Sequence, residues 1–329
     1  MKKIVDDERL IYKVCSLYYQ DDMNQQEVGD FLGVSRSSVL RMLQKGKELG
    51  IVTIELHNPR FYDYGDMEKK LEKAYGLKDV LIVEKSVLDT RQEDASYMFG
   101  NASDYLNSFF KDGDRIGVAM GNTLNNVVST NKTYDKDRDL MFVALEGSIS
   151  RITVDGTDVQ GNELARKFAA KFGGTYTQFL SPAVFSDWKV LDFFMKEKAV
   201  NYILDEFKDL NVVVVGIGVP DGTEHTLDKA GYITASERRT LVEYGAVGDM
   251  CLQFYDREGN TEPFRFFNDR VAAMRLADIR KVPNKIGIAG GERKVEAVLG
   301  AIKGGYINIL ITDTECAQKM IELAEQKEG

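Results

Sequence analysis

Apolar side chains recur at helical spacing in three segments of the first fifty residues. In residues 7–20 they lie on one face of a predicted helix: Leu10, Ile11, Val14, Leu17 and Tyr18. A second helix begins after Asn24, an N-cap residue with Glu27 three positions later, and ends at Gly33. Ser35 caps a third helix. Two short helices around a glycine-containing turn predict a helix-turn-helix.

The third helix has an apolar and a polar face. We expect Val39, Leu40, Leu43 and Leu49 to be buried. The other face carries the side-chain types that reach DNA phosphates and base edges. With Gln25 from the preceding helix, the candidate DNA contacts are Ser35, Arg36, Ser37, Ser38, Arg41, Gln44 and Lys45. Such helix pairs also occur in bundles that never meet DNA, so helices that serve only assembly remain an alternative.

A break in the pattern separates this segment from the rest. Residues 51–57, IVTIELH, alternate apolar and polar side chains and predict a wing strand. Residues 58–65 interrupt the periodicity, and a charged helix follows with Met67, Leu71 and Ala74 on one side. That helix is either a solvated spacer or an element that pairs two protomers through its apolar stripe. We therefore expect a winged helix-turn-helix domain over 1–58, a linker helix over 59–76 and a second domain over 77–329.

The second domain alternates short β-branched runs with helical segments. The runs include DVLIVE, DRIGVAM, DLMFVAL, KIGIAG and YINILITD. This order is typical of βαβ units, and it predicts an α/β fold with a doubly wound, mostly parallel sheet. In such sheets, ligands bind beyond the carboxyl ends of the strands.

Three predicted strands run into glycines and polar residues. Residues 116–123 end in Gly121, Asn122 and Thr123 at a helix start, where backbone N–H groups can hold a phosphate. Residues 212–222 have the spacing GxGxxxG rather than GxGxxG, which weakens the case for a dinucleotide cofactor. Residues 286–294 place the ammonium of Lys294 just after a glycine pair. Glycine in any one such turn can also serve backbone conformation alone.

Composition narrows the class of protein. A chain of 329 residues exceeds one typical core, and 43% hydrophobic with 29% charged residues is typical of globular domains. The apolar run 212–219 is too short to span a bilayer and the N-terminus lacks a signal stretch, so we expect a cytoplasmic protein without a membrane partner. Three scattered cysteines and two histidines offer no disulfide framework and no metal spacing, and we expect no metal and no cofactor.

Charge argues against a nonspecific nucleic-acid coat but not against a small DNA-reading head. The net charge is −9, whereas residues 35–48 carry four basic side chains and one acidic one. Positive charge is therefore concentrated on the predicted third helix.

The run MNQQEVGDFLGVSRSSVLRMLQKGKELGIVTIEL resembles the N-terminus of the SorC family of sugar-responsive bacterial regulators. It departs at Gly29 and Gly46, where that family usually has alanine. Each glycine costs roughly 1 kcal/mol in a helix interior, so we expect a less stable head. Residues 117–123, 159–165, 180–185, 214–220, 245–259 and 286–313 resemble the effector domain of that family, which is similar in fold to glucosamine-6-phosphate deaminase and ribose-5-phosphate isomerase.

The resemblance implies a sugar-phosphate site. Gly121, Asn122 and Thr123 would bind phosphate, Asp249 would accept a sugar hydroxyl, and Lys294 would pair with a phosphate or carbonyl oxygen. The implied site is completed by Gly147, Gln160, Asn162 and Gly218.

Function then divides into two classes. The resemblance implies a transcriptional regulator that binds operator DNA and a phosphorylated sugar as a homo-oligomer, a dimer or tetramer. The alternative is a sugar-phosphate isomerase or deaminase with an appended helical domain. Such chemistry needs an Asp/His/Glu set, and His225 between acidic neighbours is not part of a visible cluster. We therefore expect no catalytic residues, although Lys294 could form a reversible Schiff base with an aldehyde without turnover.

Overall fold

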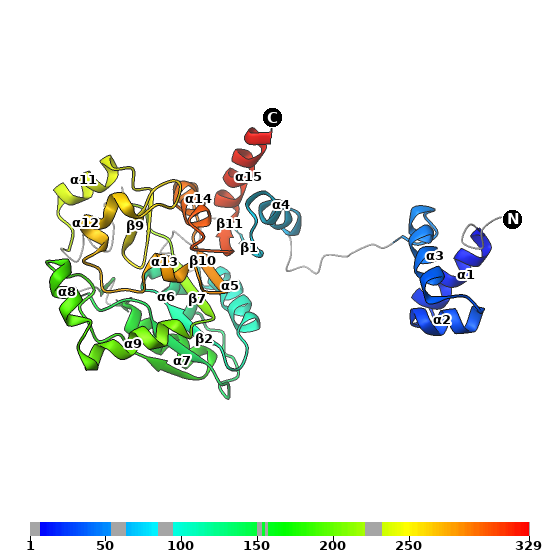
Figure 1. The fold of residues 1–329 in the computed structure, drawn as a ribbon, viewed down its shortest axis with the longest axis horizontal. Helices are drawn as coiled ribbons and strands as arrows, with labels where there is room; N and C mark the ends of the chain where they lie inside the picture. Colours follow the sequence, from blue (N-terminus) through cyan, green and yellow to red (C-terminus); the bar gives the residue numbers. More distant parts are fainter. Residues whose placement is uncertain are drawn as a thin grey trace. The chain divides into compact units, whose positions relative to one another are not determined.

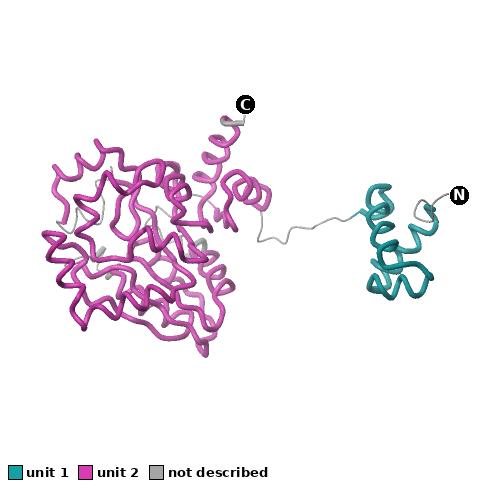
Figure 2. The backbone as a smooth tube through the Cα atoms, viewed as in Figure 1, with its two compact units in different colours: residues 1–63 teal, residues 64–329 magenta. Residues whose placement is uncertain are grey.

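The computed structural model describes residues 7–53, 64–84, 95–149, 153–154, 157–220 and 232–328. The chain forms two compact units, residues 1–63 and residues 64–329 (Figure 2). Each is described by itself.

The first unit is built from three helices (Figure 1). They are α1 (Glu8–Tyr19), α2 (Gln25–Leu32) and α3 (Arg36–Glu48). Each begins at an N-cap residue whose side chain accepts a backbone hydrogen bond. Asn24 and Glu27 form the predicted capping box, and Gly33 ends α2 with φ 67°. The helices share a core of Ile11, Val14, Cys15, Val28, Val39, Met42 and Leu43. Residues 51–53 of the predicted wing strand are irregular, and the rest of it lies outside the described residues.

The buried face of α3 differs from the predicted one. Val39 and Leu43 are buried as expected, but Leu40 and Leu49 are 53% and 45% exposed. Met42 and Gly46 are buried in their place. Positions 39, 42, 43 and 46 follow helical spacing, and Leu40 lies off that face. The prediction that Leu40 and Leu49 are buried is therefore wrong for both residues.

The second unit is organised around a seven-stranded sheet. The strands are β1 (Asp79–Val83), β2 (Arg115–Val118), β3 (Met141–Ala144), β6 (Thr175–Thr177), β7 (Val212–Gly216), β10 (Asn284–Ile288) and β11 (Ile309–Asp313). They lie in the order β1-β11-β10-β7-β2-β3-β6, and every pair is parallel. The predicted α/β fold with a parallel sheet is therefore confirmed.

Helices connect these strands. They are α4 (Gly65–Tyr75), α5 (Ala95–Phe109), α6 (Asn122–Val128), α7 (Gly161–Phe172), α8 (Trp188–Phe194), α9 (Lys198–Lys208), α11 (Ala235–Glu243), α12 (Arg265–Asn268), α13 (Leu276–Ile279), α14 (Val295–Lys303) and α15 (Thr314–Glu328), with 3₁₀ turns η3 (Glu262–Phe264) and η4 (Glu292–Lys294). None of the helices in the described part of the chain is long and apolar enough to cross a membrane.

Helix α4, which the sequence assigned to a linker, packs within the second unit. It lies beside α15 (Figure 1), where the Tyr75 hydroxyl donates to the Met320 carbonyl at 2.6 Å. Leu71 is fully buried and Met67 packs on the same core, whereas Ala74 is exposed. The apolar stripe is therefore covered by the chain's own core, which leaves little of it to pair protomers.

A second apolar cluster lies beyond the carboxyl ends of β2 and β3. It is built around an antiparallel hairpin, β8 (Gly248–Met250) and β9 (Gln253–Tyr255), and a shorter one pairs β4 (Thr153–Val154) with β5 (Thr157–Asp158). The cluster consists of Met120, Ile149, Val159, Ala183, Val184, Ile233, Leu241, Ala246, Leu252, Phe254, Phe264, Phe267 and Val271. Because Met120 lies two residues beyond the end of β2, the cluster borders the edge where a ligand is expected.

Candidate functional sites

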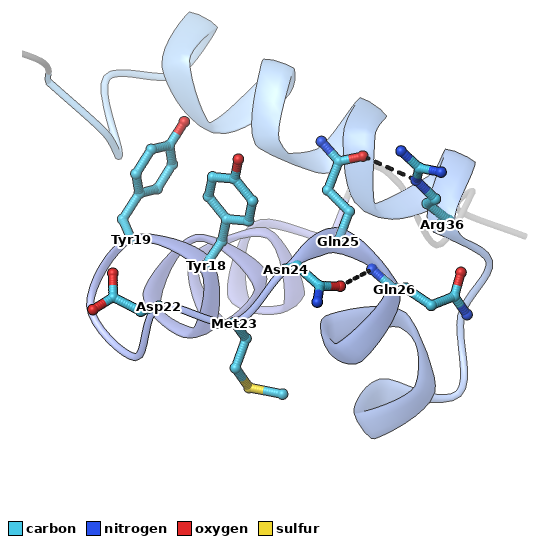
Figure 3. Close-up of a pocket in the computed structure, with 8 residues that line it drawn as sticks. All are labelled: Tyr18, Tyr19, Asp22, Met23, Asn24, Gln25, Gln26 and Arg36. Carbon is cyan, nitrogen blue, oxygen red and sulfur yellow. Dashed lines mark hydrogen bonds between the residues drawn. The ribbon is translucent and has the colours of Figure 1, made fainter.

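The exposed face of α3 carries most of the predicted DNA contacts. Arg36, Ser37, Arg41 and Gln44 are exposed. The Arg36 Nε donates a long hydrogen bond, 3.4 Å, to Gln25 Oε1 at the start of α2. Both residues border a hollow (Figure 3) whose other lining residues are Tyr18, Tyr19, Asp22, Met23, Asn24 and Gln26.

The remaining predicted contacts have local partners. Ser35 is the N-cap of α3 and accepts from the Ser38 N–H at 3.2 Å, and the two hydroxyls lie 2.9 Å apart. Lys45 pairs with Glu48 at 3.2 Å, with both side chains substantially exposed. Ser35 therefore has a structural role in starting the helix. Leu40, which the sequence predicts to be buried, is exposed among the polar side chains of this face.

The three glycine-containing loops converge in the second unit. They follow β2, β7 and β10, which are neighbours in the order β10-β7-β2. Because the strands are parallel, their carboxyl ends meet at the same edge of the sheet. Residues 221–222 of the second loop, and His225, lie outside the described residues.

Gly121 starts the first of these loops in a conformation that favours glycine. Its φ is 137°, and its N–H donates to the Val159 carbonyl at 3.0 Å. This bond ties the start of α6 to Gln160, the N-cap of α7. Asn122 is exposed and Thr123 is half-buried, so both predicted phosphate contacts lie at the surface of this edge.

Gly218 and Asp249 are brought together by backbone pairing. The Gly218 N–H donates to the Asp249 carbonyl at 2.9 Å, and the Asp249 N–H donates back at 3.1 Å. The Asp249 carboxyl lies against the Gly218 Cα, where a Cβ would overlap it. Asp249 is buried, and the absence of a side chain at residue 218 gives its carboxyl this position.

Lys294 ends the 3₁₀ turn that follows β10. The turn is fixed by Asp313, whose Oδ2 accepts from the Gly291 N–H at 2.7 Å. Lys294 is half-buried near Cys316; burial raises the pKa of that thiol to about 11, and the ammonium counteracts part of the rise. The predicted cation therefore lies at the carboxyl ends of β10 and β11.

Three other predicted effector residues have structural contacts. The Asn162 Oδ1 atom accepts a hydrogen bond from the Phe179 N–H at 2.7 Å, and the Asn162 Nδ2 atom donates one to the Phe179 carbonyl at 3.1 Å. Gln160 Oε1 accepts from the Ile149 N–H at 3.0 Å. A Cβ on Gly147 would lie 2.5 Å from the Ser181 carbonyl oxygen. These contacts hold together the loops around the edge.

Glu146 borders the candidate effector site, and the sequence reasoning missed it. It follows β3 and is fully buried, and its Oε1 accepts a hydrogen bond from the Met120 N–H beside Gly121. Burial raises the pKa of its carboxyl to about 8, against the opposing effect of that hydrogen bond. The sequence offered one indication of Glu146: it is an acidic residue that follows an apolar strand, at the sheet edge where a ligand is expected.

Comparison with known proteins covers both units. Residues 60–322 match the Sugar-bind family, described as a sugar-binding domain. The deoxyribonucleoside regulator of Bacillus subtilis is 31% identical over 316 residues, 95% of this chain and 97% of that protein. The sorbitol operon regulator of Klebsiella pneumoniae is 29% identical over 320 residues, 96% and 99% of the two chains. The crystal structure of full-length SorC from the same organism aligns with a TM-score of 0.70 at 28% identity, covering 96% of this chain and 99% of that one.

Proposed function

We propose, for a chain that belongs to the SorC family of sugar-responsive bacterial transcriptional regulators, that a phosphorylated sugar in the second unit controls the affinity of the first unit for operator DNA. The expectation that the chain is not an enzyme is confirmed by these relatives, which are transcriptional regulators.

One observation carries the effector half of this proposal. Gly121, Gly218 and Lys294 follow three neighbouring parallel strands, so a backbone anion site, the buried Asp249 carboxyl and an ammonium share one edge. A sugar phosphate needs an anion site for phosphate and a carboxyl that accepts from hydroxyls. The set of groups matches that ligand better than it matches an unphosphorylated polyol.

The DNA half rests on the exposed α3 face. Arg36 and Arg41 can neutralise phosphates, while Ser37 and Gln44 can reach base edges in the major groove. Gln25 supports Arg36 from α2. We assign DNA binding to the head that ends before α4, and effector binding to the unit that begins with it.

Regulation requires only that the effector prefer one of two states. We propose a homo-oligomer, a dimer or tetramer, that holds two heads at a fixed half-site spacing, which effector binding changes. A hundredfold change in operator affinity requires a preference of roughly 3 kcal/mol. One set of charged phosphate contacts is of that order.

The DNA assignment is tested by replacing Arg36 and Arg41 together with alanine. We expect loss of binding to an operator selected from a random duplex pool, with phosphosugar binding unchanged. The control removes two positive charges from α1 in the same unit, Arg9→Ala with Lys13→Ala, and should retain operator binding. Loss of both activities in the α3 variant would show that the two functions are misassigned.

The effector assignment is tested by Lys294→Ala. Because an ammonium–phosphate contact is worth about 1.5–3 kcal/mol, phosphosugar affinity should fall at least tenfold. Lys303→Ala, at the far end of α14, is the control and should leave affinity unchanged. Equal affinity in the Lys294 variant and the wild type would remove Lys294 from the site.

A further inference from the structure

Glu146 contacts three elements around the proposed effector site: the end of β2, the start of α7 and the β8–β9 hairpin. Its Oε1 accepts from the Met120 N–H, one residue before Gly121. The first residue of α7, Gly161, packs on the same oxygen, and a Cβ there would lie 2.8 Å from it. The carboxyl thus joins the end of β2 to the start of α7, between the proposed phosphate loop and Gln160.

The second carboxyl oxygen, Oε2, is completely buried and has no hydrogen bond of normal geometry to a described residue; the Cys251 thiol lies close enough to the carboxyl to interact with it. A buried polar atom left without a partner costs about 1–3 kcal/mol, and native structures retain few of them. Such an atom at a ligand edge is therefore expected to gain a partner when a ligand binds.

Cys251 is the side chain that faces this carboxyl from the β8–β9 hairpin. The turn there is unusual, because Cys251 and Leu252 have φ values of 47° and 62°. Non-glycine residues in the left-handed region cost roughly 1–3 kcal/mol each and cluster at ligand sites. The same hairpin carries Asp249. The strained turn therefore lies between the Asp249 carboxyl, on β8, and the Glu146 carboxyl, which Cys251 faces.

The neutral form of Glu146 predominates at pH 7, because burial raises its pKa to about 8. The other titratable groups on the elements packed around it are Cys251 and Asp249 of the hairpin and Glu163 in the first turn of α7, which pairs with Arg166 at 2.6 Å. The two residues that contact the Glu146 Oε1 atom, Met120 and Gly161, carry no charge. With Oε1 accepting from the Met120 N–H, the proton resides on Oε2.

We propose that Glu146 is a further effector-contacting residue, whose Oε2–H donates a hydrogen bond to a hydroxyl or carbonyl oxygen of the sugar. Because Glu146 is fully buried in this structure, the ligand oxygen has to displace the Cys251 side chain from its place beside the carboxyl. This inference rests on the proposed function, since it concerns the same site. It adds a donor for the sugar moiety to a site whose other groups address the phosphate and one hydroxyl.

The test compares Glu146→Gln with Glu146→Leu in the full-length protein. Glutamine keeps an acceptor for the Met120 N–H and places an N–H donor at the Oε2 position, whereas leucine keeps only volume. The probe is the compound that most raises the melting temperature of the wild type among glucose, fructose and sorbitol 6-phosphates, ribose and deoxyribose 5-phosphates and their unphosphorylated sugars. Its affinity is then measured by calorimetric titration at pH 7 and pH 9.

At pH 7 we expect Glu146→Gln to bind within threefold of the wild type and Glu146→Leu to bind at least tenfold more weakly. Ionisation of Glu146 removes the donor, so wild-type affinity should fall about tenfold from pH 7 to pH 9, as a pKa of about 8 requires. The glutamine variant should keep its affinity over this range. A purely structural Glu146 would give both proteins the same pH profile.

Glu68 provides a matched control. It is also a buried glutamate that accepts a backbone N–H, from Ile82 at 2.9 Å, but it lies against β1 at the outer edge of the sheet. Glu68→Gln and Glu68→Leu should lower the melting temperature without changing probe affinity.

The outcomes separate this inference from the proposed function. Wild-type affinity in Glu146→Leu, weak binding in Glu146→Gln, or one shared pH profile would overturn the role of Glu146 alone. If the compound that stabilises the wild type most is an unphosphorylated sugar, the phosphate assignment is overturned. The role of Glu146 is then decided by the same titrations with that sugar. Failure of every compound to stabilise the wild type would overturn both.

Discussion

At Gly46 the helices of the N-terminal unit approach so closely that a side chain has no room. A Cβ built there would lie 2.5 Å from the Cys15 Sγ, and one on Gly29 would lie 2.8 Å from the Val34 carbonyl oxygen. The helix propensity of glycine predicts a weaker head, but the packing gives both glycines a positive role. The low propensity is therefore offset by close helix contacts that alanine could not form.

The role of Gly46 is tested by replacing it with alanine. Propensity alone predicts a gain of about 1 kcal/mol, whereas overpacking costs about 1–3 kcal/mol, so we expect a net loss of stability. Thermal unfolding of the isolated head and of the full chain measures it. Adding Cys15→Ala removes the clashing sulfur and should recover part of the loss; a Gly46 variant more stable than the wild type would refute the packing argument.

Glu146 shows why part of the site could not be predicted from the sequence. Gly121 and Lys294 stood out because glycine-rich turns after strands are a local pattern. A single glutamate after a strand has no such pattern, and its buried, half-partnered state arises only when β2, α7 and the β8–β9 hairpin close around it. Its significance is a property of the tertiary structure.

The exposure of Leu40 changes which side chains α3 can present to DNA. Its exposed face contains Leu40 together with Ser37, Arg41 and Gln44. An apolar side chain within a DNA-reading face can contact a thymine methyl group in the major groove. We therefore include Leu40 in the proposed DNA contacts.

Leu40→Ala should weaken operator binding about fivefold, since the lost apolar contact is worth roughly 1 kcal/mol. Fold stability should change little, because the side chain is already exposed. Leu49→Ala, at the exposed C-cap of the same helix, is the control for a general effect of truncation. Fluorescence anisotropy with a selected operator measures both, and equal affinities for the two variants would exclude Leu40 from the interface.

Elements whose signals are local were predictable, and their arrangement was not. The Asn24 capping box and the Ser35 N-cap depend on neighbouring residues only, and both are present as predicted. The pairing of β1 with β11 joins residues more than 200 positions apart, such as Asp79 and Ile309. The packing of α4 against α15 joins residues equally far apart in the sequence, so the sequence alone predicts a linker helix where a helix of the second unit lies.

The whole molecule joins a unit that we propose binds DNA to a unit that matches a sugar-binding family. Regulation requires these parts to be coupled, because a ligand that binds both states equally shifts the equilibrium between them by nothing, however tightly it binds. Coupling also has to be reciprocal, so operator DNA must change the affinity for the effector by the same factor.

The most direct test of this coupling is the operator affinity of the full-length protein, measured by fluorescence anisotropy with and without a saturating phosphosugar identified by thermal shift. We predict a change of about a hundredfold, equivalent to roughly 3 kcal/mol, that is lost in Lys294→Ala. An operator affinity that is the same with and without a bound phosphosugar would contradict the account.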